Sequence, residues 1–494
     1  MPDIARTGFP ADVLVTLDRS RPRSFRAQLE RALRDAIARG SLAPAAALPP
    51  SRVLARELGV SRSVVAGAYE QLVIEGYLQA RRGSGTRVRA QDTGSRPRRR
   101  SQRGVPFWPV PAGRDGATPA SGLPDPALFP RHDWLRHFRD VLREIPDSGL
   151  LYPEPRGAEE LRTAVATYLG RVRGVRATGD QVLICGGFSQ GLVLLCRALG
   201  LRGVRRIAVE DPCFSHHRRL IRAAGLQPIP VPVDEQGLQT SRLAGLDVGA
   251  VLLAPAHSYP SGAVLSADRR VELLGWARAA GTLVIEDDYD AELRYDRLPI
   301  GALQGLDSQR VAYGGSVSKV LSPALRLGWL IAPPQLTEDI VRAKFLDDVA
   351  SEALGQLTLA RFIDSGAFAR HLRRVRPIYR SRRDRLLAAL AAHLPRIRPS
   401  GEAAGLHLLL RLPAELDAGT LLDTAAKHGV KLEEAARHWA DHNPQPPALL
   451  IGYGALRDSA LGHRIKALAA ELPRKTLAGT AHPRLEREPP PTGR

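Results

Sequence analysis

A single lysine, Lys319, stands among serines and small residues in the stretch SVSKVLSPALRLGW, seven positions before Arg326. An amine enclosed in a pocket has a lowered pKa and can form a Schiff base with a carbonyl compound. Ser316, Ser318 and Arg326 carry hydroxyl and guanidinium groups of the kind that bind a phosphate. Because a surface loop with one solvated lysine would also fit this stretch taken alone, its chemistry depends on the segments that accompany it.

Two further segments place complementary groups at the ends of predicted strands. Asp287 and Tyr289 follow the apolar run GTLVIE, and a buried carboxylate at such a position needs a cationic partner, for which a pyridinium nitrogen would serve. The segment QVLICGGFSQGLVLL runs from a predicted strand through two glycines into a helix. The first N–H groups of that helix, on Gly187, Phe188 and Ser189, would point at a bound anion.

Phe214, in VEDPCFSHH, could stack on an aromatic ring, although a phenylalanine in such a place more often belongs to the core. Each feature is common by itself, since acidic residues cap helices and glycines are frequent at strand–helix turns. Together they supply an amine that traps an aldehyde, a carboxylate for a ring nitrogen, a cradle for an anion and an aromatic side chain. Pyridoxal 5'-phosphate (PLP) requires this combination of groups, so the segments predict a PLP site.

The elements that position these segments indicate an α/β domain, which we place at residues 121–474. The runs RRIAVE, GAVLLA, GTLVIE and LGWLIA are continuously apolar, which is typical of a mostly parallel sheet with helices on both faces. From about Arg376 a long predicted helix leads into a smaller subdomain, at about 376–474, that contains GLHLLLRL and ALLIGYG. Residues 475–494 are rich in proline and charge and are expected to form a disordered tail.

A different pattern occupies residues 23–90. FRAQLERALRDAIARG predicts a first helix that ends at Gly40, and LPPSRVLARELGV predicts a second helix with Ser51 as N-cap and Gly59 as terminator. SRSVVAGAYEQLVIEGYL predicts a third helix capped by Ser61, and LQARRGSGTRVRA predicts a two-stranded hairpin. Two helices joined by a tight turn and followed by a hairpin form a winged helix-turn-helix.

In a winged helix-turn-helix, the first residues of the second helix of the motif meet base edges in the major groove of DNA. Here they are Ser61, Arg62 and Ser63, while the preceding helix begins with Arg52 and the hairpin turns through Gly83. We expect these five residues to contact DNA, because arginine can bind guanine and small hydroxyls can bind bases or phosphates. Either arginine taken alone could be a solvated surface charge, but the complete motif favours DNA binding.

The length and composition of the chain restrict the classes of protein to which it can belong. Its 494 residues predict more than one globular domain, and a net charge of +20 favours a polyanionic partner or simply a basic surface. Residues 1–22 are expected to form an N-terminal tail, and residues 91–120, rich in arginine and proline, predict a flexible basic linker. Three cysteines without paired spacing, no signal pattern and no long apolar run predict a cytoplasmic protein without a structural metal, a disulfide framework or a membrane span.

The two patterns resemble known families. LPPSRVLARELGVSRSVVAGAYEQLVIEGYL resembles the GntR-type winged helix, with LPPSR in place of the usual LPSSR and alanine in place of a glycine near position 45. Residues 121–474 resemble PLP-dependent fold type I aminotransferases. The combination, with the motifs APAHSYPSG, IEDDYDAELRY and SVSKVLSPALRLGW, resembles the MocR/GabR family of transcriptional regulators. The implied fold is an α/β main domain of fold type I preceded by a winged helix-turn-helix.

The resemblance implies a role for each predicted site residue. Lys319 would hold PLP as an internal aldimine, and Asp287 would bind the pyridine nitrogen. Tyr289 would approach the ring hydroxyl, while Phe214 would stack on the ring. Tyr152, in LYPEPRGAEELR, would reach the phosphate bound in the partner subunit, which implies a homodimer, typically head-to-tail. The remaining phosphate contacts would come from Gly187, Phe188, Ser189, Ser316, Ser318 and Arg326.

Two departures from aminotransferases bear on activity. Tyr259, which we count among the cofactor-binding residues, precedes PSG where aminotransferases have an asparagine that bonds the ring hydroxyl; His257 or Ser258 could take over that bond. Leu450, in LLIGYG, occupies the place of the arginine that binds the substrate carboxylate, unless Arg411 serves instead. Both departures predict impaired transamination of ordinary amino acids.

These observations favour a dimeric transcription factor that binds a double-stranded DNA operator and senses PLP, alone or as its adduct with an amino acid or amine. One alternative is a working PLP-dependent aminotransferase with an accessory DNA-binding domain. Another is a DNA-binding protein whose PLP is only structural. A half-reaction with an amino acid, followed by turnover with a 2-oxo acid, would distinguish the enzyme, and operator affinity that ignores PLP and amines would indicate the structural role.

Overall fold

The chain divides into a first unit that ends at Pro109 and a second unit that begins at Val110. The predicted linker and C-terminal tail, Gly83 and all of the predicted N-terminal tail except Leu17 lie outside the residues that the structure describes. The structure, a computed structural model, describes Leu17 and residues 25–81, 85–89, 122–295, 300–401, 403–444, 446–456 and 461–472.

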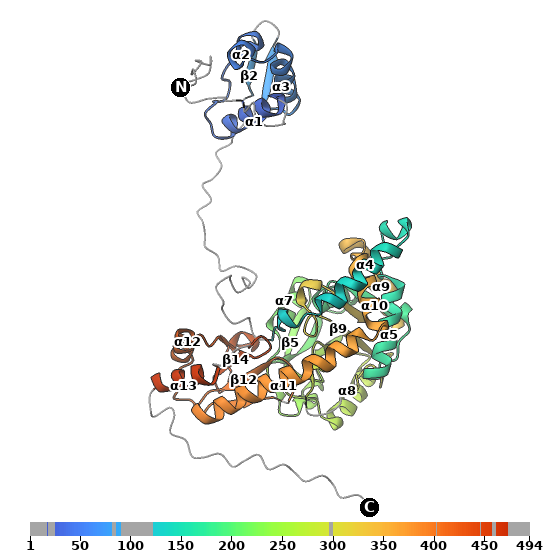
Figure 1. Cartoon of the computed structure of the whole chain (residues 1–494). Helices are drawn as coiled ribbons and strands as arrows, with labels where there is room; N and C mark the ends of the chain where they lie inside the picture. Colours follow the sequence, from blue (N-terminus) through green and yellow to red (C-terminus); the bar gives the residue numbers. More distant parts are fainter. Residues whose placement is uncertain are drawn as a thin grey trace, which may run out of the picture. The chain divides into compact units, whose positions relative to one another are not determined.

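The first unit is a three-helix winged helix (Figure 1). Its helices bury one apolar stripe each, and Leu33, Leu54 and Leu72 meet in a common core. The Tyr69 hydroxyl donates a hydrogen bond to the carbonyl oxygen of Pro49 at 2.9 Å, which fixes the start of the second helix against the third. The elements are α1 (Phe25–Ala38), α2 (Ser51–Leu58), α3 (Arg62–Ile74) and the antiparallel strands β1 (Leu78–Arg81) and β2 (Gly85–Val88).

The helix ends of this unit differ in two details from the predictions. Pro50, rather than Ser51, is the N-cap of α2, because the Pro50 carbonyl oxygen accepts the N–H groups of Val53 and Leu54. Ser61 is the N-cap residue of α3, but its hydroxyl contacts the Ser63 hydroxyl at 2.8 Å instead of capping the helix. Gly59 ends α2 in the left-handed conformation, as predicted.

The alanine that replaces the family's glycine keeps the backbone that glycine favours. Ala45 has a φ of 64°, a region that costs an alanine about 1–2 kcal/mol. Its N–H group donates to the Val88 carbonyl oxygen at 3.0 Å, and its carbonyl oxygen accepts from Arg87 at 3.1 Å. These two contacts to β2 hold the turn before α2 in place.

The second unit is built on a large sheet of eight strands, most of them parallel. The run LGWLIA forms β10, which is antiparallel to both of its neighbours, β3 and β9. A strand buried on both faces is apolar throughout, so its sequence does not reveal its direction. In sheet order the strands are β3 (Val182–Cys185), β10 (Gly328–Ile331), β9 (Val311–Ser316), β8 (Leu283–Asp288), β7 (Ala250–Leu253), β4 (Arg206–Asp211), β5 (Gln227–Asp234) and β6 (Gly237–Leu238).

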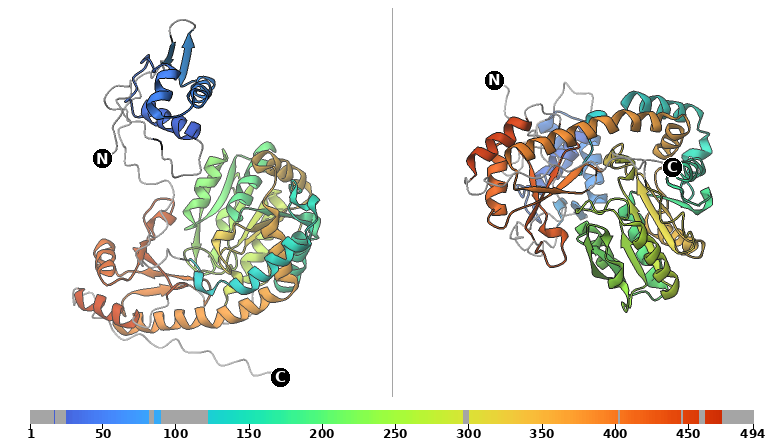
Figure 2. Two further views of the ribbon diagram at one scale, coloured as in Figure 1. Left: turned by 45° about the horizontal axis from the view of Figure 1, so that its top comes forward. Right: turned by 90° about the horizontal axis from the view of Figure 1, so that it is seen from below.

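Helices cover both faces of this sheet (Figure 2). Along β8, Leu283 and Ile285 pack on one face and Val284 on the other, as the two-residue period of a strand requires. The first face carries α6 (Phe188–Leu201), α7 (Ser215–Ala223) and α9 (Pro334–Asp348). The second carries α5 (Glu159–Arg173), α8 (Ala267–Ala280), α10 (Ala353–Asp364) with α4 (Arg131–Glu144) beside it, and the first half of α11 (Ala367–His393).

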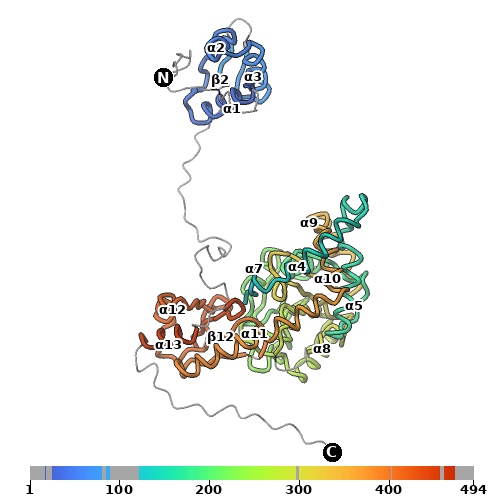
Figure 3. Tube along the Cα trace, viewed as in Figure 1, coloured from blue at the N-terminus to red at the C-terminus, as the bar shows by residue number. Residues whose placement is uncertain are grey.

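Helix α11 joins the large sheet to a smaller antiparallel sheet (Figure 1). Phe368 and Tyr379 lie in the core of the large sheet, and Leu386 and Leu390 lie in the core of the small one. The helix begins nine residues before Arg376, where its start was predicted. The small sheet has the order β11 (Arg398–Ser400), β12 (His407–Arg411), β14 (Ala448–Gly452), β13 (Leu432–Glu434), and its helices α12 (Ala418–Lys427) and α13 (Leu461–Glu471) complete this lobe (Figure 3).

Two classes of feature are missing from the part of the chain that the structure describes. None of its helices combines the length and the apolar character that a bilayer span requires. No group of three or more histidine, cysteine or acidic side chains in it is arranged to hold a metal ion.

Buried charges gather on the second face of β8. Arg173 donates to Asp288 at 2.8 Å, and the Tyr313 hydroxyl donates to the same carboxylate oxygen at 2.5 Å. One oxygen of Glu286 accepts the Gln304 N–H group at 3.1 Å, but burial raises the pKa of Glu286 to about 7. The folded protein therefore prefers this carboxyl group protonated.

Replacing Glu286 by glutamine should flatten the dependence of stability on pH. Because the pKa of Glu286 is higher in the folded than in the unfolded chain, the wild type loses stability as the pH rises through about 4.5 to about 7. Glu286→Gln keeps an acceptor for Gln304 and should avoid a loss of about 3 kcal/mol in the free energy of unfolding. Denaturant titrations at about pH 5 and about pH 8 measure it. The exposed Glu338→Gln serves as the control, and equal pH dependence of Glu286→Gln and wild type would contradict the expectation.

Candidate functional site

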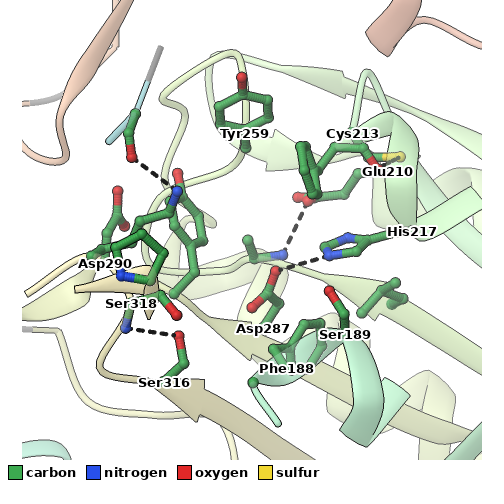
Figure 4. A pocket seen from close by; sticks show the side chains of 18 of the residues that line it. Phe188, Ser189, Glu210, Cys213, His217, Tyr259, Asp287, Asp290, Ser316 and Ser318 are labelled. Atoms are coloured by element: carbon green, nitrogen blue, oxygen red, sulfur yellow. Dashed lines mark hydrogen bonds and ion pairs between the residues drawn. The ribbon is translucent and has the colours of Figure 1, made fainter. Parts of the chain in front are cut away.

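A cavity of about 240 Å3 opens in the second unit near the ends of β4, β7, β8 and β9. In open α/β sheets, ligands bind beyond the carboxyl ends of the parallel strands. Figure 4 shows Asp290, Ser316 and Ser318 on one side of the cavity and Glu210, Cys213 and His217 on the opposite side. The cavity brings together all the predicted cofactor residues of one protomer, namely Gly187, Phe188, Ser189, Phe214, Tyr259, Asp287, Tyr289, Ser316, Ser318, Lys319 and Arg326.

Tyr152 is the predicted cofactor residue that lies elsewhere. Its side chain is 91% exposed, and it lines a separate hollow near Glu144 and Arg361. Leu151 beside it is also exposed. A role for Tyr152 in a partner's site therefore stays a prediction.

Lys319 occupies the turn between β9 and β10, and its amine reaches across the cavity. Its Nζ atom donates to the carbonyl oxygen of Gly122 at 2.9 Å. Burial lowers the pKa of Lys319, while the negative charges of Asp290 and Asp287 act in the opposite direction. The net lowering of the pKa increases the share of the neutral amine, which is the nucleophilic form.

Asp287 is the last but one residue of β8, and two residues after Ile285 it lies on the face of the sheet that carries α6 and α7. Its Oδ2 atom lies 3.6 Å from Nε2 of His217 on α7, and its buried Oδ1 atom has no hydrogen-bond partner among the described residues. Burial raises the pKa of Asp287 well above its usual range, and burial also lowers the pKa of His217 to about 3. This carboxyl group would accept a cationic N–H donor from a ligand without competition from a charged histidine.

Another part of the cavity lining is suited to an anion. Gly187 precedes α6 with a φ of 90°, and a Cβ atom there would come within 3.2 Å of Nη2 of Arg326. Arg326, with a φ of 52°, directs its guanidinium group to the carbonyl oxygen of Gly186. The N–H group of Ser318 donates to the Ser316 hydroxyl at 3.4 Å (Figure 4). Helix N–H groups, hydroxyls and a guanidinium group thus converge as in phosphate sites.

Phe214 lines the cavity and remains 40% exposed. Its ring packs edge-on against His217 at 5.3 Å and against Tyr259 at 5.5 Å between centroids. On the side of His217 (Figure 4), Glu210 accepts the Ala254 N–H group at 3.0 Å, and burial raises the pKa of Glu210 to about 7. The ring of a flat ligand would therefore lie between apolar and neutral groups.

Sequence reasoning missed several residues that line the cavity. His217 follows Phe214 by three positions on one helix, and Asp290 belongs to the acidic run EDDYD, so both had a local signal that could have identified them. Gly122 and His407 come from distant segments without any such signal. The missed lining residues that carry polar groups are Gly122, Glu210, Cys213, His217, Asp290 and His407.

The two departures from aminotransferases have different outcomes. His257, one of the two possible substitutes for asparagine, does contact Tyr289, whose hydroxyl lies 3.0 Å from the His257 Nδ1 atom. Leu450 is fully buried in the small sheet. Arg411, at the end of β12, is not among the residues that line the cavity. Within the described lining, Arg326 is the only arginine.

The predicted DNA-binding residues of the first unit lie at its surface. Arg52, Ser61, Arg62 and Ser63 are exposed at the starts of α2 and α3, whereas Gly83 lies outside the described residues. The ion pair between Arg34 of α1 and Glu75 beyond α3, 2.7 Å long, helps to hold α3 in place. The exposed start of α3 can therefore enter a groove without rearrangement of the core.

Two families match separate parts of the chain. Residues 25–88 match the gntR family of bacterial regulatory proteins, and residues 125–436 match the class I and II aminotransferases. The first match lies within the first unit and the second within the second unit. The aminotransferase match spans more than half of the 494 residues.

Relatives that align over nearly the whole chain have the names of regulators. The HTH-type pyridoxine biosynthesis transcriptional regulator PdxR of Corynebacterium glutamicum is 33% identical over 455 residues, covering 91% of this chain and 96% of the relative. The probable rhizopine catabolism regulatory protein MocR of Rhizobium meliloti is 31% identical over 470 residues, covering 92% and 95%. The solved kynurenine aminotransferase of Pyrococcus horikoshii is similar with a TM-score of 0.65 and 26% identity, over 71% of this chain and 89% of the enzyme.

Replacing Arg62 by alanine should weaken specific DNA binding by about 1–3 kcal/mol if its guanidinium group reads a base edge. The affinity is measured at fixed salt on an operator selected by the full-length protein from random sequences, and on unrelated DNA. Arg39→Ala, which removes an exposed arginine at the end of α1, is the control. An equal loss on both DNAs would make Arg62 a phosphate contact instead.

Proposed function

Because this chain belongs to the MocR-type transcriptional regulators, in which a GntR winged helix accompanies a class I and II aminotransferase domain, we propose that it senses PLP. The effector is PLP alone or its adduct with an amino acid or amine, and the output is a change in binding to an operator. One observation carries the proposal: in the cavity that holds the Lys319 amine, the Asp287 Oδ1 atom is buried and finds no hydrogen-bond partner among the residues that the structure describes.

The residues present fit PLP. When bound, PLP supplies an aldehyde that combines reversibly with amines and a pyridine nitrogen that can carry a positive charge. The Lys319 amine faces the cavity and would hold the aldehyde carbon, while Asp287 would hold the nitrogen and Phe214 would cover the ring. The phosphate would be bound by Gly187, Phe188, Ser189, Ser316, Ser318 and Arg326.

Asp287 determines which form of the pyridine nitrogen the pocket prefers. A protonated nitrogen at Oδ1 would give the buried carboxylate the opposite charge that it lacks, and this would lower the pKa of Asp287 toward its usual range. His217, which burial keeps neutral, lies 3.6 Å from Oδ2 and does not compensate the charge of the carboxylate. The site is therefore selective for a ring that carries a proton.

Lys319 also offers a route from the pocket to the rest of the chain. Its amine donates to Gly122, the first residue that the structure describes in the second unit. A ligand that engages the amine competes with this carbonyl oxygen. The next residues are anchored firmly, because Arg382 donates to Asp125 at 2.8 Å and the Tyr379 hydroxyl accepts the Asp125 N–H group at 3.2 Å. This competition can shift the equilibrium between two arrangements of the chain only if the ligand binds one arrangement more tightly than the other.

A homodimer, head-to-tail as in the family, would complete both the DNA-binding surface and the PLP site. A regulator with one winged helix per chain needs two copies to bind two half-sites of an operator. Tyr152 and Leu151 expose 91% and 71% of their surfaces, as residues do that become buried against a second copy. The partner's contribution to the phosphate site would come from this segment.

A working aminotransferase is the alternative, and the nearly complete set of PLP-binding groups favours it. Transamination of an amino acid needs a cation for the substrate carboxylate in addition to the cation for the phosphate. Among the described residues that line the cavity, Arg326 is the only one with a guanidinium group. The position at which aminotransferases have the arginine for the substrate carboxylate is occupied here by Leu450, which is buried in the small sheet. The sensing role is therefore the better match to the site.

Removing the Lys319 amine should uncouple the ligand from the DNA. Lys319→Ala should lose the absorption band of lysine-linked PLP and keep operator binding, and added PLP should no longer change that binding. Absorption spectroscopy and mobility-shift titrations measure the two properties. Lys427→Ala, an exposed lysine on α12, should behave as the wild type. A normal PLP spectrum in Lys319→Ala would refute the assignment of the amine.

Turnover separates the sensor from the enzyme. We expect the PLP-loaded wild type to show at most a slow half-reaction with amino acids and no sustained turnover when a 2-oxo acid is added. Stopped-flow spectra followed by product analysis measure this. Rapid turnover at saturating amino acid and 2-oxo acid would instead establish the aminotransferase. If PLP and amines bind but leave operator affinity unchanged, the PLP site is structural.

A further inference from the structure

Next to Lys319, three side chains from two loops meet at a single ring nitrogen. The His257 Nδ1 atom lies 2.8 Å from the Asp290 Oδ2 atom and 3.0 Å from the Tyr289 hydroxyl. His257 and Asp290 are only 3% and 2% exposed. Tyr289 and Asp290 both line the cavity, and His257 lies directly behind them. The rings of His257 and Tyr289 are nearly parallel, with 28° between their planes.

The backbone of the small lobe packs closely against His257 and Asp290. A Cβ atom on Gly405 would come within 2.5 Å of the His257 ring and within 2.7 Å of the Asp290 Oδ2 atom. A Cβ atom on Gly262 would lie 3.4 Å from the other ring nitrogen of His257. Two glycines thus allow the main chain to enclose the imidazole and the carboxylate, which leaves neither side chain room to turn away.

One nitrogen cannot serve both oxygen atoms in the same way. If Nδ1 carries a proton, it donates to the Asp290 carboxylate, and the Tyr289 hydroxyl keeps its own proton, for which the same carboxylate is an acceptor until a ligand oxygen takes its place. If Nδ1 lacks a proton, it can accept from Tyr289, but it then faces a carboxylate oxygen at 2.8 Å with no proton between them. A buried carboxylate requires a donor, so the first arrangement is favoured.

We propose that His257 and Asp290 are positioning residues that hold Tyr289 as a neutral hydrogen-bond donor beside Lys319, directed at an oxygen atom of the bound ligand. The proposal rests on PLP sensing in this cavity and adds a means of control. A ligand oxygen next to the Lys319 nitrogen can share the proton of that nitrogen. The Tyr289 hydroxyl donates to the same ligand oxygen, so this oxygen binds the proton of the Lys319 nitrogen less strongly.

The surrounding charges agree with a neutral tyrosine. Burial raises the pKa of Tyr289 well above its usual range, and the charges of Asp290 and Asp287 raise it further. Burial and the neighbouring His257 keep the pKa of His407 well below its usual range, so His407 does not supply a competing cation. The titratable groups that interact with this trio are Asp287, Lys319, Tyr259, Tyr295, His407 and Tyr453.

The test is a pH titration of the Lys319-dependent absorption band in the full-length, PLP-loaded protein. His257→Gln lacks an N–H group at the position of Nδ1, so the Tyr289 hydroxyl is no longer held as a donor to the ligand. The midpoint of the pH titration should then rise by about one pH unit, which is the effect of one hydrogen bond. His257→Asn places its amide nitrogen where Nδ1 stands and should keep the wild-type midpoint. Tyr289→Phe should shift the midpoint as His257→Gln does, and the double variant should show no further shift.

Controls separate this role from a general loss of structure. His137→Gln replaces another buried histidine, which is bonded to Ser365 at 3.2 Å, packs against Phe362 and does not line the cavity, and it should leave the midpoint unchanged. An unchanged midpoint in His257→Gln, or additive shifts in the double variant, would overturn the proposal. A wild type without any Lys319-dependent band would instead refute PLP sensing itself, before the variants are compared.

A measurement on the unaltered protein covers the case in which His257→Gln does not fold. In spectra of 15N-histidine-labelled PLP-loaded protein, the His257 signal, assigned with His257→Asn, should show a proton on Nδ1 at neutral pH. An unprotonated Nδ1 would contradict the proposed donation to Asp290.

Discussion

The chemistry of the pocket depends on how β8 distributes its acidic side chains. Successive residues of a strand point to opposite faces, and helices cover both faces of this sheet. Asp288 therefore meets the guanidinium group of Arg173 and the hydroxyl of Tyr313, which both donate to its Oδ2 atom and bring it a positive charge within the protein. Asp287 points to the other face, where its Oδ1 atom has no hydrogen-bond partner among the described residues. Because a buried carboxylate without a donor is destabilising, this position favours a ligand that brings a positive charge.

The small lobe completes the site because α11 holds it against the large sheet. The two halves of this helix belong to different cores, so the lobes are joined by packing as well as by the chain. The lobe contributes His407 to the cavity lining and the backbone at Gly405 to the wall behind His257 and Asp290. The Lys319 amine, in turn, contacts Gly122 at the start of the described second unit. Ligand binding and the arrangement of these segments are thus linked through short polar contacts.

The sequence allowed much of the fold to be predicted, because local patterns carry it. Continuous apolar runs indicated β4, β7, β8 and β10, and glycine in the left-handed conformation ended α2 at Gly59. The direction of β10 was not accessible, since burial on both faces gives the same apolar run in either direction. The cap of α2 was misassigned to Ser51, because the carbonyl oxygen that accepts the first helical N–H groups belongs to a proline whose own chemistry gave no signal.

The residues of the site likewise fall into those that the sequence identified and those that only the tertiary structure revealed. The sequence by itself determined the groups carried by short motifs: the Lys319 amine, the Asp287 carboxylate, and the glycine turn before α6, each placed by its own strand end. The tertiary structure alone decided which distant groups surround them. Gly122, His407 and the contact of His257 with Asp290 join segments up to 285 residues apart, and no local period connects such positions. Packing brings them together, because the apolar faces of helices and strands must be buried wherever the chain returns to the same core.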